Sequence, residues 1–112
     1  ESKNPDIFVS IHVNSSEKPE ITGIETHYYH QESLSLAQTV HAALASNINS
    51  KNRGLFKSKF YVINHTTSPA ILVEIGFISN ASERAELVSE KRKQATAKAI
   101  AEGVENYFKE KK

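Results

Sequence analysis

The sequence predicts an α/β fold in which a mixed, mostly parallel sheet carries helices on both faces. Segments with the spacing of strands alternate with segments with the spacing of helices along the 112 residues. Residues 70–77 are also nearly all apolar, which is typical of a strand buried on both faces of a sheet. A chain of this length forms one domain and buries roughly two-thirds of its unfolded surface, so it can hold a core without cross-links.

Four strands are predicted. The first covers residues 7–14, is rich in β-branched side chains and ends at the turn-prone segment 14–16. The residues that point to one face of this strand (Ile7, Val9, Ile11 and Val13) are all apolar. Those that point to the other face become polar toward the carboxyl end of the strand. The other strands are predicted at 23–30, 60–64 and 70–77.

The first predicted helix covers residues 33–48. Its apolar side chains recur at helical spacing, and Ser35 with Gln38 forms a candidate capping box at its start. Residues 47–54 are polar and end in glycine, so they are predicted as a loop.

Two more helices are predicted near the end of the chain. Asn80 followed by Glu83 is a capping signature that opens a short helix to about residue 88. The last helix covers about residues 91–109, and its last turn is rich in lysines, which suit the helix dipole. Its apolar stripe consists of Thr96, Ile100, Val104 and Tyr107 or Phe108.

Composition excludes several classes of protein. The apolar fraction of 38%, the charged fraction of 24% and the net charge of +1 fit a globular domain without the basic stripe of a nucleic-acid binder. The sequence has no cysteine, so it has no disulfide and no thiolate metal site. It also lacks the apolar run of about 18 residues that a membrane span needs. Phosphate-binding glycine loops, G-x-S-x-G elbows and H-E-x-x-H helices are absent.

His12 is the first of two polar residues within otherwise apolar strands. It lies near the carboxyl end of its strand, where α/β sheets bind their ligands. A neutral imidazole there offers a lone pair to a metal or to a reacting group. Taken alone, a strand histidine is more often a hydrogen-bonded core or rim residue.

Glu74 is the second polar residue within an otherwise apolar strand. It lies among apolar residues and glycine in the strand 70–77, and an unpaired buried carboxylate costs several kcal/mol or more. The carboxylate could act as a general base in a cleft. It could equally form a buried salt bridge to a lysine or arginine such as Arg53. The residues alone leave both alternatives open.

The other histidines are weaker candidates. His27 and His30 are three residues apart on one strand, so they point to opposite faces and cannot bind one ion together. His41 lies within a helix and is expected to be partly exposed. His65 lies in a loop, where it could contact a substrate or act as a turn residue.

Several segments resemble motifs of the Amidase_3 family of N-acetylmuramoyl-L-alanine amidases. They follow the family's order and spacing over essentially the whole chain, and the last helix fits as well. The segments are 8–14 (FVSIHVN, similar to SIHxN), 23–26 (GIET), 52–54 (NRG, similar to [DN]RG) and 69–80 (PAILVEIGFISN, similar to PAxLVExGFxSN).

The resemblance implies a zinc hydrolase that cleaves the amide between N-acetylmuramic acid and L-alanine in peptidoglycan. His12 matches one of the family's zinc ligands, and Glu74 matches the catalytic carboxylate that activates the zinc-bound water. Asn14 and Arg53 are candidates for contact with the substrate. Residues 1–112 then correspond to the C-terminal portion of a single amidase catalytic domain with a phosphorylase/hydrolase-like sheet.

The same resemblance implies a departure from the family. The family's first histidine and its glutamate ligand precede the SIHxN strand, and neither is found in these 112 residues. Because a catalytic zinc site normally has three protein ligands, this chain alone is expected to bind Zn²⁺ weakly and to be inactive or nearly so.

The implied setting is a secreted protein of the bacterial cell wall with peptidoglycan as its partner. The alternative is a catalytically inactive, amidase-like module that binds peptidoglycan or regulates a partner. Without an opening strand the sheet would expose an edge, through which two chains could pair.

Overall fold

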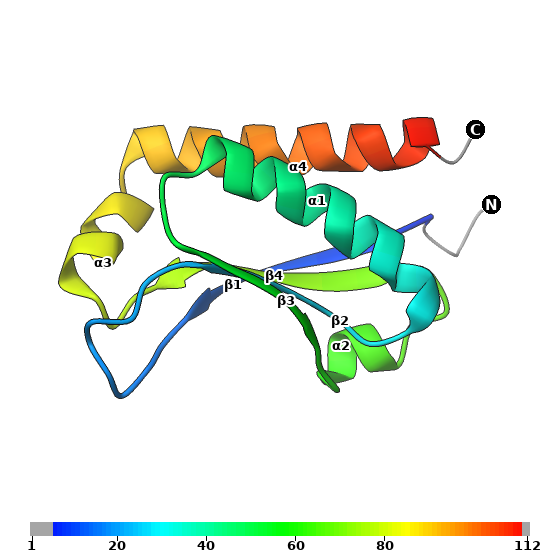
Figure 1. Cartoon of the computed structure of the whole chain (residues 1–112), viewed down its shortest axis with the longest axis horizontal. Coiled ribbons are helices and arrows are strands. Elements are labelled where there is room, and N and C mark those ends of the chain that lie inside the picture. Colours follow the sequence, from blue (N-terminus) through cyan, green and yellow to red (C-terminus); the bar gives the residue numbers. More distant parts are fainter. Residues whose placement is uncertain (1–5, 111–112) are drawn as a thin grey trace.

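The computed structural model of the chain describes residues 6–110 (Figure 1). In these residues β1 (Phe8–Asn14), β2 (Ile24–Tyr28), β3 (Asn52–Lys57) and β4 (Ala70–Phe77) form a sheet in the order β1-β4-β2-β3. β4 pairs parallel to β1 and antiparallel to β2, while β2 pairs parallel to β3. The predicted mixed, mostly parallel sheet is therefore confirmed.

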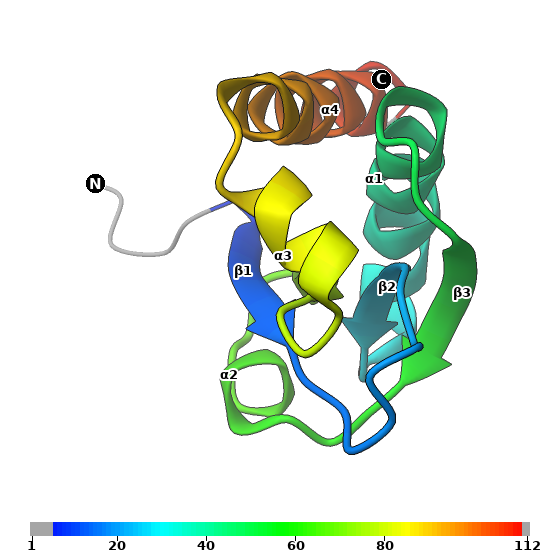
Figure 2. The ribbon, with the colours of Figure 1, turned by 90° about the vertical axis from the view of Figure 1, so that its left-hand side faces the viewer.

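Helices lie on both faces of this sheet, as predicted, but the two faces are covered unequally. The long helices α1 (Leu34–Asn47) and α4 (Glu90–Glu110) lie side by side over one face, where the main core forms (Figures 1 and 2). The single turn α2 (Tyr61–Asn64) lies on the other face. A 3-10 turn (Gln31–Ser33) precedes α1, and α3 (Ala81–Leu87) follows β4. The fully buried core side chains include Ile24, Leu36, Val40, Leu44, Ile71 and Val73.

The two long helices pack closely at Gly103 of α4. A Cβ atom at this position would lie 2.7 Å from the Cα of Val40 on α1. Since real Cβ atoms do not come this close to a backbone, the absence of a side chain at Gly103 allows the helices to pack.

The strand predicted at 60–64 is wrong, because these residues form the helical turn α2. Phe60 is its extended N-cap, and its carbonyl accepts hydrogen bonds from Ile63 N at 3.1 Å and Asn64 N at 2.9 Å. Only Ile63 of the turn is buried, whereas Tyr61 is 72% exposed. Burial of one residue in four does not follow the period of two that a half-buried strand requires.

Two further local predictions are wrong. The predicted loop at 47–54 contains the start of β3, because Asn52 and Gly54 pair with β2. The predicted capping box of Ser35 and Gln38 is replaced by a start at Leu34, where the N-cap Ser33 makes no side-chain cap bond. The Ser33 hydroxyl accepts a hydrogen bond from Ala70 N at 2.9 Å and so ties this helix end to β4.

The elements at the end of the chain agree with the prediction. The side chain of Asn80 accepts a hydrogen bond from Glu83 N at 2.8 Å, which confirms the capping signature of α3. α4 buries Thr96, Ala99, Gly103 and Tyr107 along one stripe, whereas the predicted stripe residues Ile100 and Val104 are only partly buried and Phe108 is exposed. Within the described residues, no helix has the length and apolar character needed to cross a bilayer.

Candidate active site

Three neighbouring strands place ionisable side chains at the same level of the sheet. In the strand register, His12 on β1 lies beside Glu74 on β4, and Glu74 lies opposite Glu25 on β2. The neighbouring residue on β4, Val73, packs in the main core with residues of α1. The neighbouring residue on β2, Thr26, forms a hydrogen bond with His41 of α1. Both side chains therefore point to the face that α1 covers. Alternate strand residues point to opposite faces, so the three ionisable side chains share the face that α1 and α4 do not cover.

Glu74 lies at the centre of this row. It is 8% exposed, and within the described residues its Oε1 has no hydrogen-bond partner. Burial raises the pKa of the Glu74 carboxyl, His27 and His12 lower it, and Glu25 raises it, with a net upward shift. A carboxylate with a raised pKa and a free oxygen is well suited to accept a proton from a reacting water.

Arg53 binds Glu25 rather than Glu74, so the alternative of an Arg53–Glu74 salt bridge is wrong. Its Nε donates a hydrogen bond to Glu25 Oε2 at 2.7 Å, and the guanidinium lies 5.3 Å from the ring centroid of Phe77. In the described residues Glu74 forms no ion pair. Among these residues, the buried carboxylate of Glu74 therefore lacks the counter-charge that the salt-bridge alternative required.

The carboxylate of Glu25 is fully engaged by its neighbours. Its Oε1 lies 2.8 Å from His27 Nε2 and accepts a weak bond from Asn14 Nδ2 at 3.4 Å. The other ring nitrogen of His27 lies 2.7 Å from Ser58 Oγ. These partners hold the Glu25 carboxylate in place opposite Glu74.

Glu25 and His27 had no predicted role in the site. The signal that could have revealed them is the alternation Glu25-Thr26-His27, which puts two ionisable side chains on one face of a buried strand. His27 and His30 were expected on one strand with their side chains on opposite faces, but β2 ends at Tyr28, so only His27 lies on the strand. His30 lies beyond β2, where its Nε2 is 2.9 Å from the carbonyl oxygen of Asn64.

The structure brings the predicted site residues to one face. His12 is exposed at the rim, with its Nε2 2.9 Å from Ser10 Oγ. Asn14 and Arg53 meet at Glu25, which lies next to Glu74.

His41 lies on the opposite face of the sheet, packed between α1 and β2. It was expected to be partly exposed, and this is wrong, because it is buried between Thr26 Oγ1 and Asn52 Oδ1, each 2.7 Å from one of its ring nitrogens.

The described residues do not complete a metal centre. No group of three His, Cys, Asp or Glu side chains in residues 6–110 is placed to hold one ion. His12 is the candidate ligand, and the neighbouring carboxylate of Glu25 is occupied by Arg53 and His27. The residues present therefore do not fit a three-ligand zinc site.

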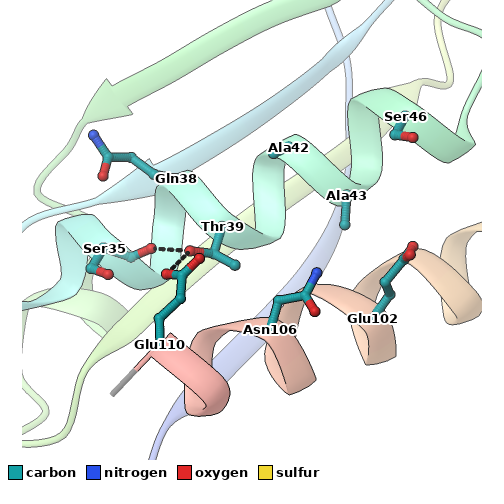
Figure 3. Close-up of a pocket in the computed structure, with 9 residues that line it drawn as sticks. All are labelled: Ser35, Gln38, Thr39, Ala42, Ala43, Ser46, Glu102, Asn106 and Glu110. Atoms are coloured by element: carbon teal, nitrogen blue, oxygen red, sulfur yellow. Dashed lines mark hydrogen bonds between the residues drawn. The ribbon is translucent and has the colours of Figure 1, made fainter. Parts of the chain in front are cut away.

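A hollow of about 500 Å³ lies between α1 and α4, away from this row (Figure 3). Thr39 donates hydrogen bonds to the carbonyl oxygen of Ser35 and to Glu110, and Asn47 donates to Glu102. Both glutamates at this hollow thus bond to α1. The hollow lies between two helices, and its lining includes none of His12, Glu25 and Glu74.

Comparison with known proteins identifies the family of this chain. The sequence model described as N-acetylmuramoyl-L-alanine amidase (Amidase_3) matches residues 1–106. The chain is 39% identical over 107 residues to the uncharacterized protein YqiI of Bacillus subtilis, covering 92% of this chain and 52% of that protein. It is 35% identical over 112 residues to the amidase LytC of the same species, covering 96% of this chain and 23% of LytC.

A solved structure leads to the same family. The catalytic domain of CwlV, an N-acetylmuramoyl-L-alanine amidase from Bacillus (Paenibacillus) polymyxa var. colistinus, superposes with a TM-score of 0.91 at 38% identity. The match covers 93% of this chain and 58% of that domain, so the chain spans little more than half of its relatives' domain. The chain belongs to the N-acetylmuramoyl-L-alanine amidase family.

Proposed function

We propose that the chain supplies one side of the active site of an N-acetylmuramoyl-L-alanine amidase. The bond cleaved is the amide between the lactyl group of N-acetylmuramic acid and the L-alanine of the stem peptide. The observation that carries the proposal is Glu74, a buried carboxylate beside His12 whose Oε1 has no hydrogen-bond partner in the part of the chain that the structure describes. Membership of the amidase family supports the choice of substrate.

Glu74 is proposed as the general base and then the general acid. Its carboxylate accepts a proton from the attacking water, whose oxygen bonds to the scissile carbonyl carbon. As the carbon–nitrogen bond breaks, the same carboxyl group donates the proton to the departing amine of L-alanine. The burial that raises the pKa of Glu74 favours this transfer in both directions.

Arg53 and Asn14 are proposed to act next to this group. Both bond to Glu25, so they fix a charged carboxylate opposite Glu74. The guanidinium of Arg53 is partly exposed, and this leaves donors for the carbonyl or carboxylate groups of a stem peptide.

Zinc is proposed as the cofactor of the complete family domain, with His12 as one ligand. Since the described residues hold no three-ligand group, the other ligands must be supplied from outside them, and the 112-residue chain alone is expected to be inactive or nearly so. The proposed setting is a secreted protein acting on the bacterial cell wall. The relatives named as amidases support this setting.

The test is release of stem peptides from purified peptidoglycan by the longest natural protein that contains this chain. Glu74→Gln, which keeps the shape but cannot take up a proton, should lower the rate by about 10²–10⁴-fold. The matched control is Glu86→Gln, an exposed carboxylate on α3, and it should retain full activity. Full activity of Glu74→Gln would exclude Glu74 as the base. A wild-type protein that binds peptidoglycan without releasing peptide would favour the inactive binding module.

A further inference from the structure

Four aromatic side chains form an exposed group on the face that carries Glu74, and we call this group the aromatic platform. Its members are Phe56 at the end of β3, Phe60 and Tyr61 at the start of α2, and His65 after α2. Phe56 is 36%, Phe60 40% and Tyr61 72% exposed. Apolar surface grouped in this way marks an interaction site more often than single exposed apolar residues do.

The platform is continuous with the row of ionisable residues through His27. The His27 ring stacks on Phe56 at a centroid distance of 5.1 Å and packs against Phe60 at 5.0 Å. The same ring contacts Glu25 at 2.8 Å, and Glu25 lies opposite Glu74. A molecule whose scissile bond reaches Glu74 therefore meets aromatic rings on one side.

The outer end of the platform is a stacked pair of amphipathic rings. The rings of Tyr61 and His65 are nearly parallel, with an interplanar angle of 21° and a centroid distance of 4.0 Å. Each ring carries a hydrogen-bonding group on its edge. The surface thus offers apolar faces for stacking and a polar rim for hydrogen bonds.

We propose that the aromatic platform binds the sugar rings of the glycan strand next to the scissile amide. This inference rests on the proposed function. A pyranose ring presents a face of C–H groups, which packs on the electron-rich face of an aromatic ring, while its hydroxyl and N-acetyl groups bond to the rim. The cleaved amide is attached to a muramic acid residue, so a sugar must lie close to Glu74.

The stem peptide is the other part of the substrate that could occupy the platform. Extended peptides are usually bound along a strand edge or in an apolar groove. Phe56 lies near the end of the edge strand β3, but the other three rings lie at or beside α2, a single helical turn that offers no strand edge. The platform therefore fits the sugar ring better than the peptide.

The test is a titration of the 112-residue chain with peptide-free glycan, a tetrasaccharide of alternating N-acetylglucosamine and N-acetylmuramic acid, followed by amide chemical shifts. Tyr61→Ala should weaken binding about three- to tenfold, as expected for the loss of one stacking ring. Tyr61→Phe should restore most of it. Phe108→Ala, which removes a 38% exposed ring from α4, is the matched control and should bind like the wild type.

The possible outcomes separate this inference from the proposed amidase function. The tetrasaccharide contains no scissile amide, so its binding is measured independently of hydrolysis, and hydrolysis is measured separately with Glu74→Gln. Equal affinities of Tyr61→Ala and Phe108→Ala, or no binding by the wild type, would overturn the inference. If Tyr61→Ala weakened the binding of free stem peptide but not of the tetrasaccharide, the platform would be assigned to the peptide. That result would also overturn the inference. Thermal melting of Tyr61→Ala checks that the variant is folded.

Discussion

Glu74 and Glu83 are both buried carboxylates, but their surroundings are opposite. Glu83 is 4% exposed and accepts hydrogen bonds from Gly23 N and Phe77 N, each at 2.9 Å, and from Arg92 Nη2 at 2.8 Å. Glu74 Oε1 has no such partner within the described residues. A buried carboxylate whose oxygens are all hydrogen-bonded connects parts of the fold. A buried carboxylate with an oxygen that lacks a hydrogen bond is a candidate for a functional role.

The first stability prediction concerns Glu83. Burial alone would raise its pKa, but the bonds from Ser50, Gly23, Phe77 and Arg92 outweigh burial and hold the pKa below its usual value of 4.5. Glu83→Gln leaves the buried guanidinium of Arg92 without its counter-charge, so it should lower the free energy of unfolding at pH 7 by about 3 kcal/mol or more. Urea denaturation would measure this difference.

The pH dependence provides a second check on Glu83. A carboxyl whose pKa is lower in the folded state stabilises the protein above the unfolded value of 4.5, and this contribution disappears as the pH falls through the folded pKa. The difference between wild type and Glu83→Gln should therefore shrink as the pH is lowered below about 4.5. A difference that stays constant from pH 7 to pH 3 would contradict the assignment. Glu86→Gln, an exposed change on the same helix, should leave stability unchanged.

Elements whose pattern is strong within the element itself were predictable from the sequence. β4 carries apolar residues on both of its faces. The side chain of Asn80 caps α3 by accepting a hydrogen bond from Glu83 N. β3 and α2 were not predictable, because their conformation depends on distant partners. Gly54 pairs with Glu25 of β2, and Ile63 packs on Leu72 of β4. In β3 and in α2, contacts with distant parts of the chain outweighed the weak local preference for a particular secondary structure.

Gly103 gives a prediction at the scale of helix packing. Replacing a helical glycine usually stabilises an exposed helix by about 0.5–1 kcal/mol. Here a new Cβ would meet Val40 Cα at 2.7 Å, so Gly103→Val should force α4 away from α1 and lower the free energy of unfolding by about 1–3 kcal/mol. Ala101→Val, on an exposed position of the same helix, should cost less than 1 kcal/mol, since only helix propensity changes. Equal costs for both variants would show that the helices tolerate the added side chain.

At the scale of the whole molecule, the order of the strands assembles the candidate site. From the sequence, Glu74 was indicated by its isolated position in an apolar strand and by the motif around it, whereas His12 was indicated mainly by the family resemblance. Glu25 joins them only because β2 pairs antiparallel to β4, and the sequence did not predict this pairing. The site residues are separated by up to about sixty residues in the chain and meet in one row through strand order. Residue types could therefore be predicted, whereas the partner of Arg53 required the structure.

The composition of this row leads to a prediction about zinc. His12 lies at the exposed rim, and no three-ligand group exists in residues 6–110, so the 112-residue chain should bind Zn²⁺ weakly and far below one ion per chain. Dialysis against a defined zinc buffer followed by elemental analysis would measure the occupancy. Because His12 is exposed, His12→Ala should leave the melting temperature within the range of ordinary surface substitutions while removing the residual zinc. Tight, stoichiometric zinc in the wild-type chain would contradict the prediction and would require ligands other than His12 within these residues.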